Sequence, residues 1–113
     1  MTTIYHNNRC RKSRETLAIL EDKNEEIQIV NYLETPPTEK ELAGIIKLLD
    51  ISPLELVRKN EQIWKDNYKG KEHSDAELIS IMHQNPKLIE RPIVIKNGKA
   101  VLGRPPENVT KIL

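Results

Sequence analysis

The spacing of apolar positions changes twice in the first 31 residues. Thr2–Tyr5 contains β-branched and aromatic residues, which are favoured on the pleated surface of a strand. From Lys12 to Asp22 the apolar residues recur at helical spacing, which predicts an amphipathic helix. Apolar and polar residues alternate over Glu25–Asn31, which predicts a second strand. This order of strand, helix and strand is typical of a right-handed βαβ unit with two parallel strands.

The middle of the chain, at about 38–85, carries only helix signals. Prolines at 36 and 37 prevent the preceding strand or a helix from continuing. Helix starts are then marked by an N-cap with a capping box or a proline at three places: Thr38 with Glu41, Ser52 with Pro53, and Ser74 with Glu77. The polar stretch 61–72 predicts irregular or loosely helical structure. We therefore expect a helical insertion between two β-containing ends.

The last segment has the pattern of a β-hairpin. Asn97-Gly98 separates the apolar runs 92–96 and 99–103, and this dipeptide favours a two-residue type I′ turn. The turn fixes the register, so that Arg91 opposes Arg104 at the open end of the hairpin. Opposed cations destabilise a sheet; either an anion lies between them, or both point into solvent, where screening weakens the repulsion. Prolines at 105 and 106 then predict a closing helix.

This element order, βαβ followed by a helical insertion and ββα, predicts an α/β thioredoxin-like fold with a mixed four-stranded sheet. We expect one domain, 1–113, with the insertion at about 38–85. In this fold a cis-proline commonly precedes the third strand, and Pro92 occupies that position. Arg91 and Arg104 are then expected to lie beside Cys10, which follows the first strand.

Composition excludes several classes of protein. The 113 residues suffice for one ordinary domain. With 31% charged residues and a net charge of +1, no global field indicates binding to nucleic acid or to a membrane surface. No apolar run approaches the roughly 20 residues of a membrane-spanning helix, and no signal peptide is visible. The single cysteine excludes an internal disulfide, which favours a cytoplasmic location.

Cys10 stands where the first predicted helix begins. Free backbone N–H groups and the helix dipole favour an anion there, and Arg9, Arg11, Lys12 and Arg14 add positive charge. Cysteines in comparable settings have pKa values of roughly 3.5–7.5. Cys10 is therefore a candidate nucleophile, in a loop that can also bind an oxyanion such as phosphate, sulfate or arsenate. The alternative is a buried, inert cysteine, which the flanking cations disfavour.

Five sequence motifs, in order along the chain, resemble the glutaredoxin-coupled arsenate reductase family: His6-Asn7-Asn8-Arg9-Cys10 with Ser13-Arg14, Tyr32–Thr38, Leu56–Asn60, Asn85-Pro86 with Arg91–Val94, and Gly103-Arg104-Pro105. The resemblance extends essentially from end to end. It implies a nucleophilic cysteine at Cys10 and an oxyanion site made of three arginines: Arg58, Arg91 and Arg104. Supporting roles fall on His6, Ser13, Arg14 and Pro92. For His6, orienting the loop, tuning Cys10 and simple packing stay open.

The resemblance implies reduction of arsenate to arsenite, with glutathione as co-substrate and glutaredoxin as partner. No bound cofactor or metal is expected, and we expect a monomer. Two other functions stay open. One is a glutathione-dependent thiol oxidoreductase with another substrate. The other is a redox regulator like the Spx-type transcription factors, which bind RNA polymerase; their switch usually uses Cys-x-x-Cys, and the run 10–13 has only one cysteine.

Overall fold

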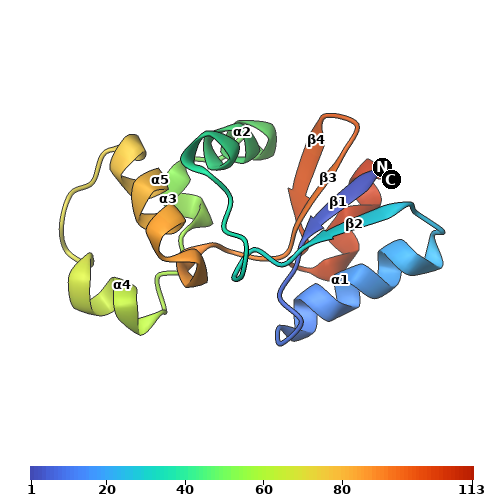
Figure 1. The fold of residues 1–113 in the computed structure, drawn as a ribbon, viewed down its shortest axis with the longest axis horizontal. Coiled ribbons are helices and arrows are strands. Elements are labelled where there is room, and N and C mark those ends of the chain that lie inside the picture. The colour runs from blue at the N-terminus through green and yellow to red at the C-terminus, as the bar shows by residue number, and fades with distance from the viewer. The chain divides into compact units, whose positions relative to one another are not determined.

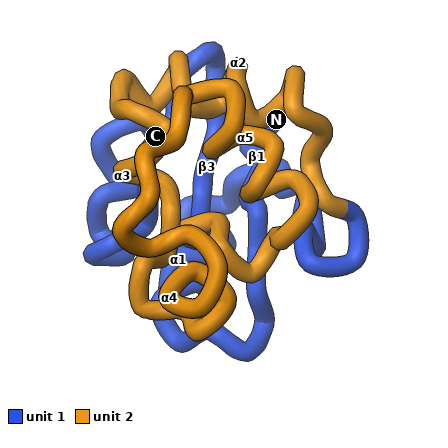
Figure 2. The backbone as a smooth tube through the Cα atoms, turned by 90° about the vertical axis from the view of Figure 1, so that its left-hand side faces the viewer, with its two compact units in different colours: residues 1–35, 91–113 blue, residues 36–90 orange.

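The computed structural model describes residues 1–113 and divides into two compact units, which Figure 2 shows in different colours. Unit 1 comprises residues 1–35 and 91–113, and unit 2 comprises residues 36–90. The helical segment expected at about 38–85 falls inside unit 2. The interpretation of the chain as one domain with an insertion stays a prediction.

Unit 1 contains a four-stranded mixed sheet in the order β2-β1-β3-β4 (Figure 1). Its strands are β1 (Thr2–Tyr5), β2 (Ile27–Val30), β3 (Ile93–Lys96) and β4 (Lys99–Leu102). β1 runs parallel to β2 and antiparallel to β3, which pairs antiparallel with β4. The predicted βαβ unit and hairpin are therefore both confirmed, and they share one sheet through the pairing of β1 with β3.

The hairpin has the predicted register, with Val94 opposite Val101. Asn97 and Gly98 have φ values of 52° and 74°, the left-handed conformation that a type I′ turn requires at both central positions. At the open end, the Gly103 N–H donates to the Pro92 carbonyl at 2.9 Å. The peptide bond before Pro92 is cis, as predicted.

The core of unit 1 lies between the sheet and two helical segments, α1 (Arg11–Asp22) and the 3₁₀-helix η2 (Pro106–Ile112). Four side chains with no exposed surface form its centre: Ile4, Leu20, Val94 and Val109. The predicted closing helix is present, and it is a 3₁₀-helix. Prolines at 105 and 106 remove two backbone donors at its start, and short segments favour i→i+3 bonds.

Unit 2 is helical: α2 (Glu39–Leu49), α3 (Pro53–Leu56), α4 (Gln62–Asn67), α5 (Asp75–Gln84) and the 3₁₀-helix η1 (Pro86–Leu88). The predicted capping boxes at Thr38 and Ser74 are both formed. α5 packs against α2 and α3 and buries Leu78 and Met82. Within the polar stretch 61–72, which was predicted to be irregular or loosely helical, residues 62–67 form α4, and its Trp64 is buried. Gly70 follows this helix with a φ of 79°.

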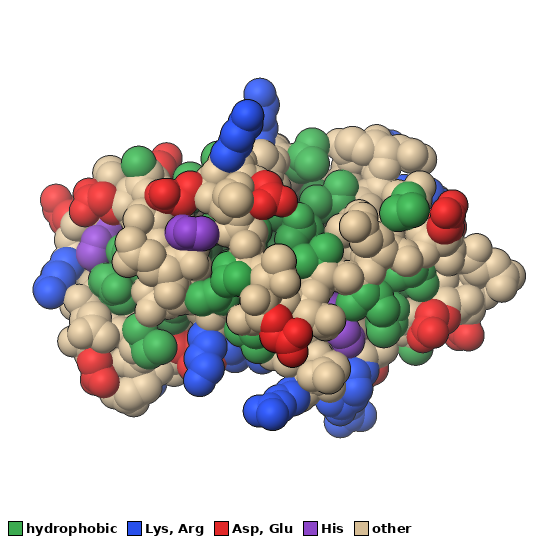
Figure 3. Space-filling model, in the orientation of Figure 1, with side chains coloured by type: hydrophobic (Ala, Val, Ile, Leu, Met, Phe, Trp, Pro, Cys, Tyr) green, Lys and Arg blue, Asp and Glu red, His purple; other side chains and the backbone are tan.

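The distribution of surface charge and the lengths of the helices bear on the expectation that the protein binds neither nucleic acid nor a membrane. On the face shown in Figure 3, acidic and basic side chains are interspersed rather than gathered by sign. Each helix is too short or too polar to cross a lipid bilayer.

Candidate active site

Cys10 is the N-cap residue of α1, in the extended conformation with φ −92° and ψ 121°. Its N–H donates to the Asn7 carbonyl at 3.0 Å, and its carbonyl accepts the first helical bond from the Arg14 N–H at 3.0 Å. The N–H groups of the first helical turn have no partner inside the helix. The prediction that Cys10 lies where the helix begins is therefore confirmed.

The thiol of Cys10 is buried, with 8% of the residue exposed. Burial raises the pKa of the thiol, but opposing effects are larger in sum. The backbone N–H groups of Ser13 and Lys12 donate to the sulfur, and the positive charges of Arg91 and Arg104 favour the thiolate. The pKa of Cys10 therefore lies below its ordinary value. The alternative of a buried cysteine is right about burial, while the lowered pKa argues against an inert thiol.

The cations that flank Cys10 in sequence are not the groups that lower its pKa. Arg11 points into solvent, with its side chain 86% exposed, and pairs with Glu15 at 2.9 Å. The Arg14 guanidinium donates to the Asn8 carbonyl at 3.0 Å and so closes the loop. The part of the sequence-based explanation that relied on the flanking cations was therefore wrong, because side chains close in sequence leave a helix start in different directions, whereas the part that relied on the helix N–H groups is confirmed.

His6 and Ser13 connect the two ends of the cysteine loop. His6 follows β1 and is buried, and its Nδ1 lies 2.6 Å from the Ser13 Oγ in the first turn of α1. The same Oγ accepts the N–H of Asn7 at 3.1 Å. Burial, and next the charge of Arg14, lower the pKa of His6 and so favour the neutral ring. Of the roles left open for His6, these contacts favour orienting the loop.

Gly103 allows the open end of the hairpin to approach α1 closely. A Cβ at this position would lie 2.5 Å from the Thr16 Oγ1 and 2.7 Å from the Pro92 Cγ. Thr16 is fully buried, and its Oγ1 donates to the Lys12 carbonyl at 2.8 Å. This contact joins the segment that carries Arg91 and Arg104 to the helix that begins at Cys10. Nothing in the sequence pattern marked Thr16.

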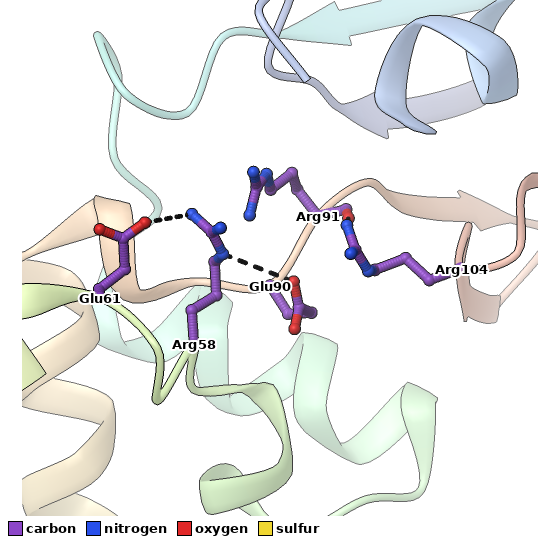
Figure 4. A network of polar contacts seen from close by, with 5 residues as sticks. All are labelled: Arg58, Glu61, Glu90, Arg91 and Arg104. Atoms are coloured by element: carbon purple, nitrogen blue, oxygen red, sulfur yellow. Dashed lines mark hydrogen bonds and ion pairs between the residues drawn. The ribbon is translucent and has the colours of Figure 1, made fainter. Parts of the chain in front are cut away.

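Arg91 and Arg104 flank the open end of the hairpin, as the register predicted. The Arg104 Nη1 donates to the Arg91 backbone carbonyl at 3.3 Å (Figure 4). Both residues are half-buried, so the alternative in which both point into solvent is wrong. Their charges act on the Cys10 thiolate. Unit 1 alone therefore contains the Cys10 thiol, two arginines and the helix N–H groups that donate to the sulfur.

Arg58 belongs to unit 2, in a short strand-like contact. Its N–H donates to the Leu88 carbonyl at 2.7 Å, and the Glu90 N–H donates to the Leu56 carbonyl at 2.8 Å. The guanidinium forms ion pairs with Glu61 and with Glu90, the latter at 3.7 Å (Figure 4). Its side chain is 26% exposed. Arg58 is thus a half-buried and oriented cation. Sequence reasoning missed both carboxylates.

The described residues contain no group of three or more His, Cys, Asp or Glu side chains that could hold a metal ion. The polar groups gathered at Cys10 are hydrogen-bond donors and cations instead. Such a set binds anions.

Comparisons with known proteins show the family to which the chain belongs. Residues 5–112 match the model of the ArsC family. Over 97% of its length the chain is 48% identical to YfgD of Escherichia coli K12, which is described as uncharacterized, and the match covers 94% of that protein. Over the same share of its length it is 44% identical to an arsenate reductase of Haemophilus influenzae, of which the match covers 97%. The solved arsenate reductase of Vibrio cholerae superposes with a TM-score of 0.94 at 45% identity, over 99% of this chain and 97% of that one. The chain therefore belongs to the ArsC family and has its thioredoxin-like fold.

Proposed function

We propose that this protein reduces arsenate to arsenite, with Cys10 as the nucleophile. The proposal rests mainly on one observation: a thiol with a lowered pKa lies at a helix N-terminus under the influence of Arg91 and Arg104. A thiolate is the reactive form of cysteine, and the same donors suit a tetrahedral oxyanion. Family relatives named arsenate reductase support arsenate as the oxyanion.

In the first step, the Cys10 thiolate attacks the arsenic atom. A sulfur–arsenic bond forms, an arsenic–oxygen bond breaks, and the leaving hydroxide takes a proton and becomes water. The N–H groups of Lys12 and Ser13 and the guanidinium groups of Arg91 and Arg104 stabilise the negative charge on the oxyanion. Because these groups are already in place, the step needs little help from a general acid or base.

The two electrons come from outside the chain, because Cys10 is its only cysteine. For each arsenate reduced to arsenite, two molecules of glutathione are oxidised to one disulfide, and one oxygen atom leaves as water. We propose that glutathione attacks the arsenylated Cys10 and that glutaredoxin resolves the product by thiol–disulfide exchange. A reducing cytoplasm supplies both partners, and we place the protein there as a monomer.

Arg58 is proposed as the third oxyanion-binding arginine, from the family resemblance of the run 56–60. Its half-burial and its ion pairs with Glu61 and Glu90 support the proposal, since they hold the guanidinium in one orientation. His6, Ser13 and Arg14 are proposed to support the loop.

The test is arsenate-dependent consumption of NADPH in the presence of glutathione, glutathione reductase and glutaredoxin. We expect saturable activity in the wild type and none in Cys10→Ser, with both proteins shown to be folded by circular dichroism. Equal activity in Cys10→Ser would refute the nucleophile. An inactive wild type whose Cys10 still titrates with a lowered pKa would refute arsenate as the substrate.

A further inference from the structure

A cavity of about 350 Å³ lies in unit 1 beside the cysteine loop. It is lined by residues 6–9, which follow β1, and by Asn31, Leu33 and Glu34, which follow β2. β1 and β2 are parallel neighbours, so both loops leave the sheet at the same edge, where α/β proteins commonly bind ligands. Its volume is within the range of small-molecule sites.

The cavity is on a different side of the cysteine loop from the arginines. In the sheet order β2-β1-β3-β4, the cavity belongs to the β1–β2 side, whereas Arg91 and Arg104 belong to the β3–β4 side. Cys10 follows directly after Arg9, which lines the cavity. The Cys10 side chain is not part of the lining, so a second reactant bound here would lie beside the loop that carries Cys10 and would leave the oxyanion on Arg91 and Arg104.

The lining carries charges of both signs that the protein does not neutralise. The Arg9 guanidinium and the Glu34 carboxylate form no ion pair or hydrogen bond in the structure, and both residues are exposed. Asn8 and Asn31 add amide groups that can donate and accept. An oxyanion alone would be repelled by Glu34, and an apolar ligand would leave these groups unpaired. The lining instead fits a ligand with an ammonium group, a carboxylate group and peptide bonds.

His6 adds a directed donor to the cavity. The Ser13 hydroxyl has no other acceptor and therefore donates to Nδ1 of His6, which places the ring hydrogen on Nε2. This nitrogen makes no hydrogen bond within the chain, although only 6% of His6 is exposed. Nε2 is not among the fully buried atoms that lack a partner, so it is open to a carboxylate or carbonyl oxygen of a ligand in the cavity.

The loop backbone is already fixed in shape. The Arg9 N–H donates to the Asn7 Oδ1 at 3.0 Å. On the other side, the N–H groups of Glu34 and Thr35 donate to the Asn31 carbonyl at 3.0 and 2.9 Å. A preformed site loses less conformational entropy when a ligand binds.

We propose that this cavity binds the external thiol as a short zwitterionic peptide of the glutathione type, with Arg9 holding a carboxylate and Glu34 holding the ammonium group. The inference rests on the proposed function in one respect only, namely that an external thiol must react at Cys10. It adds a binding site for that thiol, separate from the site of the oxyanion.

The test measures binding without arsenate, in a Cys10→Ser background that prevents covalent capture. Glutathione is titrated into ¹⁵N-labelled protein and the amide shifts are followed by NMR. We expect saturable shifts at Asn7, Asn8, Asn31 and Glu34. Arg9→Gln should raise the dissociation constant about ten-fold, as expected for a lost charged hydrogen bond. Arg11→Gln is the matched control, since Arg11 lies on the other side of position 10, points into solvent and should leave binding unchanged.

A change in the ligand tests the orientation. N-acetylglutathione lacks the ammonium group, so Glu34→Gln should weaken binding of glutathione but not of N-acetylglutathione. Shifts confined to the residues around Arg91 and Arg104, or equal losses for Arg9→Gln and Arg11→Gln, would overturn the proposal. Its failure is distinguishable from that of the proposed function: arsenate reduction with an unchanged KM for glutathione in Arg9→Gln refutes the cavity alone, whereas glutathione binding without arsenate turnover refutes the function alone.

Discussion

Cys10 shows how a buried thiol can still have a lowered pKa. Burial opposes the thiolate, and the low pKa arises only because two backbone N–H groups and two arginines outweigh it. Cys10, Lys12 and Ser13 are neighbours in sequence, so a helix start next to a cysteine already indicates this part of the effect. Arg91 and Arg104 lie at the other end of the chain. Among the sequence signals, only the hairpin register predicted that these two arginines lie opposite each other.

Loss of either arginine should raise the pKa of Cys10. Arg91→Ala and Arg104→Ala each remove a positive charge that favours the thiolate, so the thiolate fraction at a given pH falls. The measurement is the rate of alkylation by iodoacetamide as a function of pH, and both variants should shift the curve to higher pH. Arg11→Ala should leave the curve in place, because Arg11 is exposed and paired with Glu15. Identical curves for all four proteins would show that neither arginine acts on the thiol.

The contact between α1 and the hairpin decides where the arginines lie, and sequence patterns did not predict it. Capping boxes, the Asn-Gly turn and apolar spacing are local signals, and each gave its element within a few residues. The fit of Gly103 against Thr16 and Pro92 depends on atoms from three separate segments, so no single stretch carries a signal for it. The ion pairs of Arg58 with Glu61 and Glu90 were not predicted for the same reason, since no sequence pattern indicates them.

Two glycine substitutions should have opposite effects on stability. Gly103→Ala places a methyl group 2.5 Å from the Thr16 Oγ1, and overpacking of this kind costs about 1–3 kcal/mol. Gly44→Ala in α2 meets no atom within 4 Å and should stabilise the protein by about 0.5–1 kcal/mol, because glycine is a poor helix former. Urea unfolding measures both changes. A neutral Gly103→Ala would mean that Thr16 and Pro92 give way and that this contact does not fix the hairpin.

At the scale of the whole molecule, the proposed oxyanion ligands come from both ends and the middle of the chain. Cys10 precedes the helical unit, Arg91 and Arg104 follow it, and Arg58 lies within it. The sequence predicted the sheet because strands at both chain ends carry clear alternation and turn signals. It gave no local reason for a role of Arg58, which rested on resemblance alone. Thermal unfolding in the presence of arsenate can test the contribution of all three arginines to oxyanion binding in one assay.

Arsenate should raise the temperature of thermal unfolding, because a ligand that binds only the folded state stabilises it. At a concentration 100 times the dissociation constant, the gain is about 2.7 kcal/mol. In a Cys10→Ser background, which prevents arsenylation, each of Arg58→Ala, Arg91→Ala and Arg104→Ala should reduce the shift. A ten-fold weaker affinity corresponds to a loss of about 1.4 kcal/mol. Differential scanning calorimetry with Arg11→Ala as the control measures these shifts. A full shift in Arg58→Ala, together with reduced shifts in the other two, would remove Arg58 from the oxyanion site and leave a site built from unit 1 alone.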